Sequence, residues 1–319
     1  MAIYYAGIDL GGTRMRAALA DSEGKMVRRS DALTERGLGS ERIVERMIEV
    51  VGEAMGGERA GVACLGVGAP GPLDARTGVL FHPVNLTTDD VPLKELLEDR
   101  LGLPVRVHND ANAAALGEWL FGGHGQTQHL IYVTVSTGVG AGIISHGRLI
   151  DGFNTTAGEI GHTVVDPNGP PCGCGNRGCV EAICSGSSIA RAATAALGTV
   201  TAGRMMTLAG GKLDGVTAEV VAQAAREGDE LASRIFFHAA DTLGIAVVNL
   251  IHLFSPEIVI IGGGVAEAGD LLFGPVRERV LRTAMSLPAL GVRIRPPGLG
   301  QDAGLVGAIA LAMGAGIDR

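Results

Sequence analysis

The chain has 319 residues, which is too long for one small core and suits two lobes or one large α/β unit. Hydrophobic residues make up 46% of it and charged residues 19%, so it can bury a sizeable core, and extensive disorder is not expected. The net charge of -8 at pH 7 argues against a nucleic-acid-binding protein, because such proteins usually carry a basic patch.

The 50 glycines are the unusual part of the composition. They fall between apolar runs and show no collagen-like period. This distribution predicts turns and places where one backbone segment approaches another closely.

Neither export nor a membrane span is expected. Residues 1–9 lack the basic segment and long apolar core of a secretory signal. The most apolar late stretch, residues 243–264, is broken by His252 and by Ser255-Pro256-Glu257, which predicts a helix followed by a strand. Three of the five cysteines cluster, which favours a metal site in a reducing compartment over disulfides. We therefore expect a cytoplasmic protein.

The first predicted elements form a meander of strands. Residues 3–10 are an apolar run that contains Asp9, and Gly11-Gly12-Thr13 follows as a turn. A second apolar run covers residues 17–20 and a third begins near residue 26. A helix is predicted next, because apolar residues recur on one helical face, at Ile43, Met47 and Val51.

Two further strands are predicted before the middle of the chain. The first covers residues 62–67 and ends in a loop, residues 68–71. The second covers residues 105–107 and ends at Asn109-Asp110, directly before an alanine-rich run that predicts a helix. A carboxylate is therefore expected where a strand passes into a helix.

A second glycine-rich hairpin follows in the next part of the chain. Residues 130–135 predict a strand, and Ser136-Thr-Gly-Val-Gly-Ala-Gly142 forms the turn. This turn lies about 125 residues after the first one, which indicates an internal duplication with two lobes that each open with a glycine-rich turn. The remaining predicted elements are helices over residues 187–197, 217–227, 229–254 and 305–313 and a strand over residues 258–261.

Each glycine-rich hairpin is a candidate phosphate site. A diglycine turn followed by a hydroxyl, as in Asp9-Leu-Gly-Gly-Thr13, can place backbone N–H groups against phosphate oxygens. Asp9 can hold Mg²⁺ through water, although an ordinary hairpin turn explains the same pattern. The second hairpin follows the same logic, and the presence of both favours phosphate binding. Neither is a Walker loop, because no Gly-Lys-Ser/Thr follows.

The segment Gly66-Val-Gly68-Ala-Pro70-Gly71 formally matches a dinucleotide-binding motif. Such a site needs a helix to begin at the glycines. Pro70 and Pro72 favour a loop instead, whose backbone can line a substrate pocket.

Asn109-Asp110 is a candidate catalytic pair. A carboxylate beside a helix N-terminus is kept ionised by the helix dipole. It can accept a proton from an alcohol that attacks a γ-phosphate, while Asn109 offers a donor and an acceptor to sugar hydroxyls. The alternative is that Asp110 or Asn112 only caps the helix.

A histidine and three cysteines indicate a metal site. His162 precedes Cys172-Gly-Cys174-Gly-Asn-Arg-Gly-Cys179, and this set predicts a structural tetrahedral Zn²⁺ site without an open position. Three unrelated thiols are the alternative, with Cys184 as a rival ligand.

Two carboxylates, Glu159 and Glu181, bracket the cysteine cluster. Paired acids suit a ring of sugar hydroxyls, although both are equally consistent with solvated surface charges. Further on, the strand over residues 258–261 opens into Gly262-Gly263-Gly264, which allows an adenine ring to lie against backbone or simply forms a turn.

In this order, these motifs resemble the ROK family of sugar kinases and repressors, within the hexokinase–actin–heat-shock superfamily. The resemblance runs from Asp9 to the last helix, and residues 159–181 are its most specific part. It implies a two-lobed α/β fold of ribonuclease-H-like topology, of the hexokinase/actin type, with a central cleft. The implied lobes are a small one of residues 1–110 joined by the C-terminal helix 305–319, and a large one of residues 111–304 that carries the zinc segment.

The resemblance also implies the role of each motif. Asp110 would remove the proton from a sugar 6-hydroxyl, with ATP and Mg²⁺ as phosphate donor and cofactor. The sugar would be held by Gly68, Pro70, Gly71, Asn85, Asn109, Asp110, Glu159, His162 and Glu181. The nucleotide would be held by Asp9, Gly11, Gly12, Thr13, Thr137, Gly138, Gly262, Gly263 and Gly264. Structural Zn²⁺ would be bound by His162, Cys172, Cys174 and Cys179.

Two positions depart from the family pattern. Ser136 stands where many members have glycine, which can alter nucleotide contacts. Arg14 stands where lysine or asparagine is common, and it either touches phosphate or faces solvent.

The expected function is ATP-dependent phosphorylation of a hexose 6-hydroxyl. Asn85 favours glucose, because it matches a sugar-contacting asparagine of the glucose-phosphorylating members. N-acetylmannosamine, N-acetylglucosamine and allose are the alternative sugars. The resemblance to the family also implies a homodimer or homotetramer.

Two other classes of function are less consistent with the sequence. A sugar-responsive repressor of this family carries a DNA-binding domain before the first hairpin, and we expect none here because that hairpin begins at Asp9. The acidic charge also argues against nucleic-acid partners. A non-catalytic sugar sensor would not need Asp110 beside the phosphate hairpins.

Overall fold

The computed structural model describes residues 2–35, 39–82, 90–198 and 203–316. The chain divides into two compact units. Unit 1 contains Met1–Tyr132, Gly142–Gly158 and Pro297–Arg319, and unit 2 contains Val133–Ala141 and Glu159–Pro296. Residues 111–132 therefore lie in unit 1, whereas the resemblance implies a lobe boundary at Asp110. That lobe boundary stays a prediction.

Unit 1 is built on a five-stranded sheet in the order β3-β2-β1-β4-β8. The first three strands form the predicted antiparallel meander, and β4 and β8 are added parallel to β1. The strands are β1 (Tyr4–Leu10), β2 (Arg14–Ala20), β3 (Met26–Leu33), β4 (Val62–Ala69) and β8 (Val105–Asn109). A small separate sheet contains β5 (Leu73–Asp74), β6 (Val79–Leu80) and β7 (Val91–Pro92).

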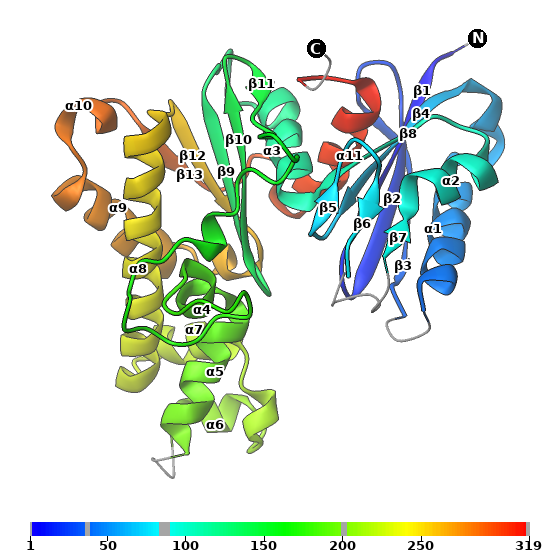
Figure 1. The fold of residues 1–319 in the computed structure, drawn as a ribbon. Coiled ribbons are helices and arrows are strands. Elements are labelled where there is room, and N and C mark those ends of the chain that lie inside the picture. The colour runs from blue at the N-terminus through cyan, green and yellow to red at the C-terminus, as the bar shows by residue number, and fades with distance from the viewer. Residues whose placement is uncertain (1, 36–38, 83–89, 199–202, 317–319) are drawn as a thin grey trace. The chain divides into compact units, whose positions relative to one another are not determined.

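Helices cover both faces of the five-stranded sheet (Figure 1). They are α1 (Ser40–Met55), α2 (Leu93–Leu101), α3 (Asp110–Phe121) and α11 (Ala303–Met313). Because side chains alternate along a strand, Ile8 and Leu10 of β1 point into the apolar core shared with α1 and α2, whereas Gly7 and Asp9 face α11. The polar end of β1 therefore lies on the α11 face.

Helix α11 packs against its neighbours at backbone distance. A Cβ atom added to Gly66 of β4 would lie 1.9 Å from the carbonyl oxygen of Ala308. On the α3 side of α11, a Cβ atom on Gly307 would lie 2.0 Å from the carbonyl oxygen of Ala113. These two contacts explain part of the high glycine content, because no larger residue fits where helix and sheet backbones touch.

The second five-stranded sheet has the order β11-β10-β9-β12-β13. Strands β12 and β13 belong to unit 2, β11 belongs to unit 1, and β9 and β10 have residues in both units. These strands are β9 (Leu130–Val135), β10 (Val139–Ser145), β11 (Arg148–Leu149), β12 (Ile258–Gly262) and β13 (Arg293–Arg295). The helices of unit 2 are α4 (Val180–Cys184), α5 (Gly186–Leu197), α6 (Arg204–Leu208), α7 (Ala218–Arg226), α8 (Glu230–Phe254), α9 (Asp270–Thr283) and α10 (Ser286–Ala289). The helices predicted for α5, α7 and α8 are confirmed to within one residue at each end.

Helix α8 is the one helix in the described part of the chain that is long and apolar enough to cross a membrane by length and composition. In its most apolar window, 61% of the residues are buried inside the protein, as in the core helix of a globular unit. Ser255 ends the helix in the left-handed conformation, directly before Pro256. The helix-then-strand reading of this stretch is thus confirmed by α8 and β12.

The close packing of α11 leads to a stability prediction. We expect Gly66→Ala to destabilise the protein by at least about 2 kcal/mol, because the added methyl group overlaps the Ala308 carbonyl and helix or strand must move. The matched control is Gly52→Ala inside α1, where nothing lies within 4 Å of the added Cβ atom. This control should stabilise by about 0.5–1 kcal/mol. Thermal unfolding midpoints compare the two, and a Gly66→Ala protein as stable as the wild type would contradict the packing.

Candidate active site and metal centre

Three parallel strands of unit 1 end side by side. In the sheet register, Asp9 of β1 is paired with Gly68 of β4, and Gly68 is paired with His108 of β8. The loops that follow carry the predicted Gly11-Gly12-Thr13 turn, the Pro70-Gly71 loop and Asn109-Asp110. Ligands of open α/β sheets bind at the carboxyl ends of parallel strands, so this edge is the candidate site of unit 1.

The first glycine-rich turn is fixed by Thr34, which lies just after β3. The backbone N–H of Thr34 donates to the carbonyl of Thr13 at 2.9 Å, and its hydroxyl donates to the carbonyl of Gly11 at 2.7 Å. Thr34 is completely buried. Thr34 could not be found from the sequence, because a single threonine after a strand carries no signal of its own.

Asp9 lies against the first turn of α11 and beside Arg16. A Cβ atom on Gly304 would lie 2.9 Å from Asp9 Oδ2, so the glycine makes room for this carboxylate at the helix start. Arg16 Nη2 lies 2.5 Å from the same oxygen, and Arg16 Nη1 donates to the carbonyl of Gln301 at 2.7 Å. Asp9 is therefore held from two sides, and Arg16 was missed by sequence reasoning.

Arg14 is part of an exposed ion pair. It lies 2.9 Å from Asp31 on the neighbouring strand β3, and its side chain is 65% exposed. Arg14 is thus exposed and paired with Asp31, and its contact with phosphate is not tested by this ion pair.

Asn109 caps α3, and Asp110 is its first residue. Asn109 Oδ1 accepts from the backbone N–H groups of Ala111 at 2.9 Å and Asn112 at 3.4 Å. The cap is thus Asn109, not Asp110 or Asn112 as the alternative interpretation had it. Asp110 Oδ1 accepts from the backbone N–H of Ala111 at 2.8 Å, which places its carboxylate at the positive end of the helix dipole.

The pKa of Tyr132, in β9, is affected by carboxylates of unit 1. Its side chain is buried, and burial raises the pKa of its phenol well above the ordinary value, with the charges of Glu118, Asp110 and Asp9 adding to the shift. Asp9 and Asp110 therefore act on one buried group, so they lie in one region of unit 1. Tyr132 was not identified from the sequence.

The second glycine-rich turn belongs to unit 2 and is held by α4 and α5. Gly186 N–H donates to the carbonyl of Ser136 at 2.7 Å, and the Ser187 hydroxyl donates to the carbonyl of Thr137 at 2.9 Å. Glu181 Oε2 accepts from the backbone N–H of Val139 at 2.9 Å. A Cβ atom on Gly138 would lie 2.5 Å from that same oxygen, so glycine is required at this position.

A cavity of about 380 Å³ lies inside unit 2 beside this turn. Its lining includes Thr137 and Gly264, which the sequence analysis placed at the nucleotide. It also includes Ser187, Thr217, Glu219 and Arg226, which it did not identify. Gly264, which follows β12, and the second glycine-rich turn thus border one pocket that is large enough for a small ligand.

Asn85, a predicted sugar contact, lies outside the described residues. The other predicted sugar contacts divide between the units: Gly68, Pro70, Gly71, Asn109 and Asp110 lie in unit 1, and Glu159, His162 and Glu181 lie in unit 2. Their contacts with a sugar stay predictions.

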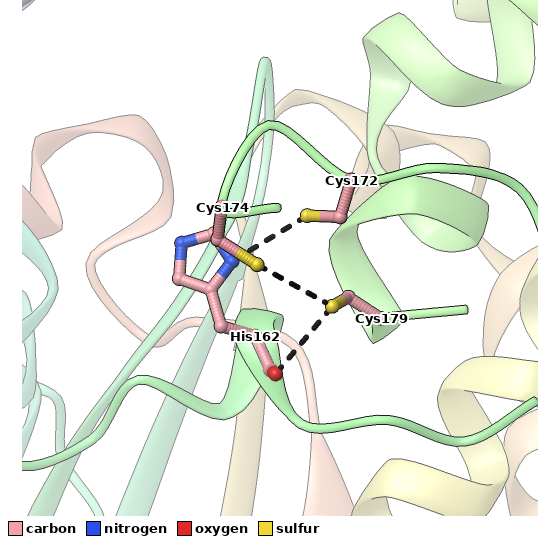
Figure 2. Close-up of side chains that lie close together, drawn as sticks. All are labelled: His162, Cys172, Cys174 and Cys179. Atoms are coloured by element: carbon pink, nitrogen blue, oxygen red, sulfur yellow. Dashed lines mark hydrogen bonds between the residues drawn. The ribbon is translucent and has the colours of Figure 1, made fainter. Parts of the chain in front are cut away.

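The predicted metal ligands are brought together in unit 2. Figure 2 shows the sulfur of Cys172 directed at the imidazole ring of His162, and the sulfurs of Cys174 and Cys179 directed at each other. One ligand atom from each of His162, Cys172, Cys174 and Cys179 lies within 4.8 Å of all the others. The backbone supports this arrangement, since Cys172 N–H donates to the carbonyl of Asn176 at 2.8 Å.

Two of the distances between the ligand atoms match the edges of a tetrahedral zinc site. Bonds of about 2.3 Å to sulfur and about 2.05 Å to nitrogen imply edges of about 3.8 Å between two sulfurs and about 3.6 Å between sulfur and nitrogen. The structure has 3.7 Å between Cys174 Sγ and Cys179 Sγ, and 3.6 Å between Cys172 Sγ and His162 Nδ1. The cluster therefore forms a site that can hold a metal ion.

The thiols differ in their surroundings. The backbone N–H of Asn176 holds the pKa of Cys174 below its ordinary value, at about 7, whereas burial raises the pKa of Cys179 to about 12. A cation among them would favour the thiolate form of all three cysteines. Cys184 is buried, and burial raises the pKa of its thiol further still, so it is the least suited to supply a thiolate.

Glu159 lies beside His162, on the side away from the sulfurs. Its carboxylate is 4.0 Å from His162 Nε2, the ring nitrogen opposite the one that faces Cys172. Partial burial raises the pKa of Glu159, His162 opposes this, and Glu181 adds to it. Its side chain is 53% exposed, so solvent screening keeps these effects small.

Comparison with known proteins agrees with the family that the motifs suggested. A model of the ROK family matches residues 5–315. Among curated relatives, glucokinase of Thermotoga maritima is 38% identical over 96% of this chain and 96% of its own length. N-acetylmannosamine kinase of Escherichia coli is 34% identical over 96% of this chain and 97% of its own length.

A solved structure extends the likeness to the fold. A ROK family glucokinase from Streptomyces griseus, in complex with glucose and AMPPNP, has a TM-score of 0.85 and is 35% identical, covering 98% of this chain and 100% of its own. The chain belongs to the ROK family. The two-lobed α/β fold class expected from the sequence is thereby confirmed.

The ligand geometry predicts stoichiometric metal. We expect one tightly bound transition-metal ion per chain, and we expect Cys174→Ser to lose it because one of the four donors disappears. Cys184→Ala, which removes the rival thiol, should keep the ion. Elemental analysis of protein purified without added metal measures both, and full retention by Cys174→Ser would show that another side chain serves as the fourth ligand.

Proposed function

We propose that this protein is a sugar kinase that transfers the γ-phosphate of ATP to the 6-hydroxyl of a hexose, with glucose as the preferred sugar. The observation that carries the proposal is the position of Asp110, at the start of α3 and at the strand ends where Asp9 also lies. The similarity to glucokinases over almost the whole chain supports the reaction and the choice of sugar.

In the proposed reaction, Asp110 is the general base. Its carboxylate takes the proton of the 6-hydroxyl while that oxygen attacks the γ-phosphorus, and the bond to the β–γ bridging oxygen breaks to release ADP. The start of α3 favours the ionised carboxylate, and the Asn109 cap fixes the helix end that carries it.

Mg²⁺ bound with the nucleotide would neutralise charge on the phosphates. Asp9 is the residue proposed to hold it, and the Gly11-Gly12-Thr13 turn would face the phosphates from unit 1. The turn at Thr137-Gly138 would do the same from unit 2, with the adenosine in the cavity bordered by Gly264. Thr34 and Ser187 support the proposal, because each holds one of these turns in a fixed conformation.

The metal centre is proposed to bind structural Zn²⁺. One imidazole and three thiolates are the donor set that Zn²⁺ prefers, and four protein ligands leave no position for water or substrate. The ion would therefore shape the segment that carries Glu159 and Glu181 and take no part in the chemistry.

We also propose a cytoplasmic location. The oligomeric state, a dimer or tetramer, stays a prediction.

N-acetylmannosamine is the second candidate sugar. The kinase of Escherichia coli that bears this name is nearly as similar to the chain as some glucokinases. A panel of glucose, mannose, allose, N-acetylglucosamine and N-acetylmannosamine, assayed side by side for ADP release, decides between them by the ratio of kcat/KM values.

The base assignment predicts the behaviour of one variant. Asp110→Asn should lower kcat by about 10²- to 10⁴-fold, because the amide cannot take the proton. Glucose binding, followed by calorimetry, should persist, since the substitution keeps the size of the side chain. The measurement is ADP release under saturating glucose and Mg-ATP.

Asp99→Asn is the matched control, because Asp99 is an exposed carboxylate of α2, a helix that carries none of the proposed site residues. It should leave kcat unchanged. Near-normal turnover of Asp110→Asn would refute the assignment of the base, whereas a wild-type protein that phosphorylates none of the sugars would refute the proposed function as a whole.

A further inference from the structure

A buried histidine that none of the motifs explains lies directly before Asn109-Asp110. His108 is the last residue but one of β8, and its side chain is only 5% exposed. Its neighbours in the sheet register are Gly68 and, through Gly68, Asp9. A buried imidazole at this edge of the sheet needs a structural or functional reason.

The hydrogen bonds of His108 define which ring nitrogen carries the proton. The backbone N–H of Asn109 lies 2.9 Å from Nδ1, and because a backbone N–H can only donate, Nδ1 must offer its lone pair. The proton is therefore on Nε2, which lies 3.0 Å from Asp151 Oδ1. Asp151 thus holds the tautomer that leaves Nδ1 free to accept.

The same nitrogen also orients the first turn of α3. Asn112 Nδ2 lies 3.3 Å from His108 Nδ1, and Asn112 is almost completely buried. Asn112 Oδ1 has no hydrogen-bond partner in the described part of the chain, so the contact with His108 is what orients this amide. The imidazole consequently holds the chain just before Asp110, at Asn109, and just after it, at Asn112.

Asp151 is itself anchored within unit 1. Its carbonyl oxygen accepts from the backbone N–H of Ala157 at 2.9 Å. In the same segment the hydroxyl oxygen of Thr155 accepts from the backbone N–H of Ala75 at 2.8 Å. The carboxylate that faces His108 therefore belongs to a loop that is hydrogen-bonded to Ala75, the residue after β5.

We propose that His108 is a positioning residue for phosphoryl transfer. With its proton on Nε2 facing Asp151, its Nδ1 lone pair fixes the peptide of Asn109 and the amide of Asn112, and so sets the place of the Asp110 carboxylate between them. The proposal rests on the proposed role of Asp110 as base. It assigns His108 no contact with substrate.

Positioning of this kind acts on the reaction more than on binding. A catalytic group displaced by about 1 Å can lower the rate by about 10²-fold, because the reacting atoms must be aligned within the bound complex. Loss of the Nδ1 acceptor should therefore lower kcat and leave the KM values for sugar and ATP nearly unchanged.

Two substitutions separate the two nitrogens of the ring. The side chain of His108→Asn can place an acceptor oxygen where Nδ1 lies but cannot reach Asp151. The side chain of His108→Gln can place a donor where Nε2 lies but offers nothing to the Asn109 N–H. We expect His108→Gln to lose about tenfold or more in kcat, and His108→Asn to stay within about threefold of the wild type.

Thermal midpoints of both variants are measured beside the kinetics. If His108 only stabilised the fold, kcat would follow the loss of stability in both variants alike, or KM would change as much as kcat, and the proposal would fail. Wild-type kcat in His108→Gln would overturn it as well. Asp110→Asn, assayed in parallel, reports on the base itself and not on His108.

Amide hydrogen exchange in the absence of substrates gives a test that does not depend on activity. Exchange of the peptide covering residues 109–112 should be faster in His108→Gln than in His108→Asn, while the peptide covering α2 is unchanged in both. If the wild type phosphorylated no sugar, the proposed function would fail, and this comparison would still decide whether Nδ1 holds the junction. Equal exchange in the two variants would overturn the proposal.

Discussion

The close approach of α11 to the sheet is the constraint on which unit 1 depends. At Gly66 and Gly307 the helix backbone touches β4 on one side and α3 on the other, so the three elements can move only together. The first turn of α11 then lies against Asp9, and the first turn of α3 carries Asp110. These two packing contacts thus determine where both carboxylates lie relative to the strand ends.

The two glycine-rich turns are stabilised by the same means from different neighbours. A glycine turn that binds a polyanion through backbone N–H groups must be stiff, because ordering it at the moment of binding would cost conformational entropy. In unit 1 the buried Thr34 bonds to both ends of the turn. In unit 2 Ser187 and Glu181 bond to the backbone of the turn. In both units, the side chains that hold the turn are hydroxyls or carboxylates that lie far from the turn in the sequence.

The sequence predicts those parts of the site that are contiguous in the chain. Short spacing and residue type predict the candidate metal ligands, both glycine turns and Asn109-Asp110. Length and apolar pattern predict the long helices of unit 2. Arg16, Thr34, Tyr132 and the pair of His108 with Asp151 could not be found in this way. Each acts through a partner that only strand register or the folding of a distant loop brings near, and no local pattern encodes such a pairing.

The metal centre and the second glycine turn are joined through one short helix. Cys179 directly precedes α4, and Glu181 in the first turn of that helix accepts from the Val139 N–H at the end of the glycine turn. An ion bound by four protein ligands has no position for substrate, so it can influence the reaction only through what it holds in place. Because it would fix the start of α4, it would fix the Glu181 carboxylate and with it the turn. A structural metal bound here would therefore act on the proposed phosphate-binding turn as a rigid cross-link.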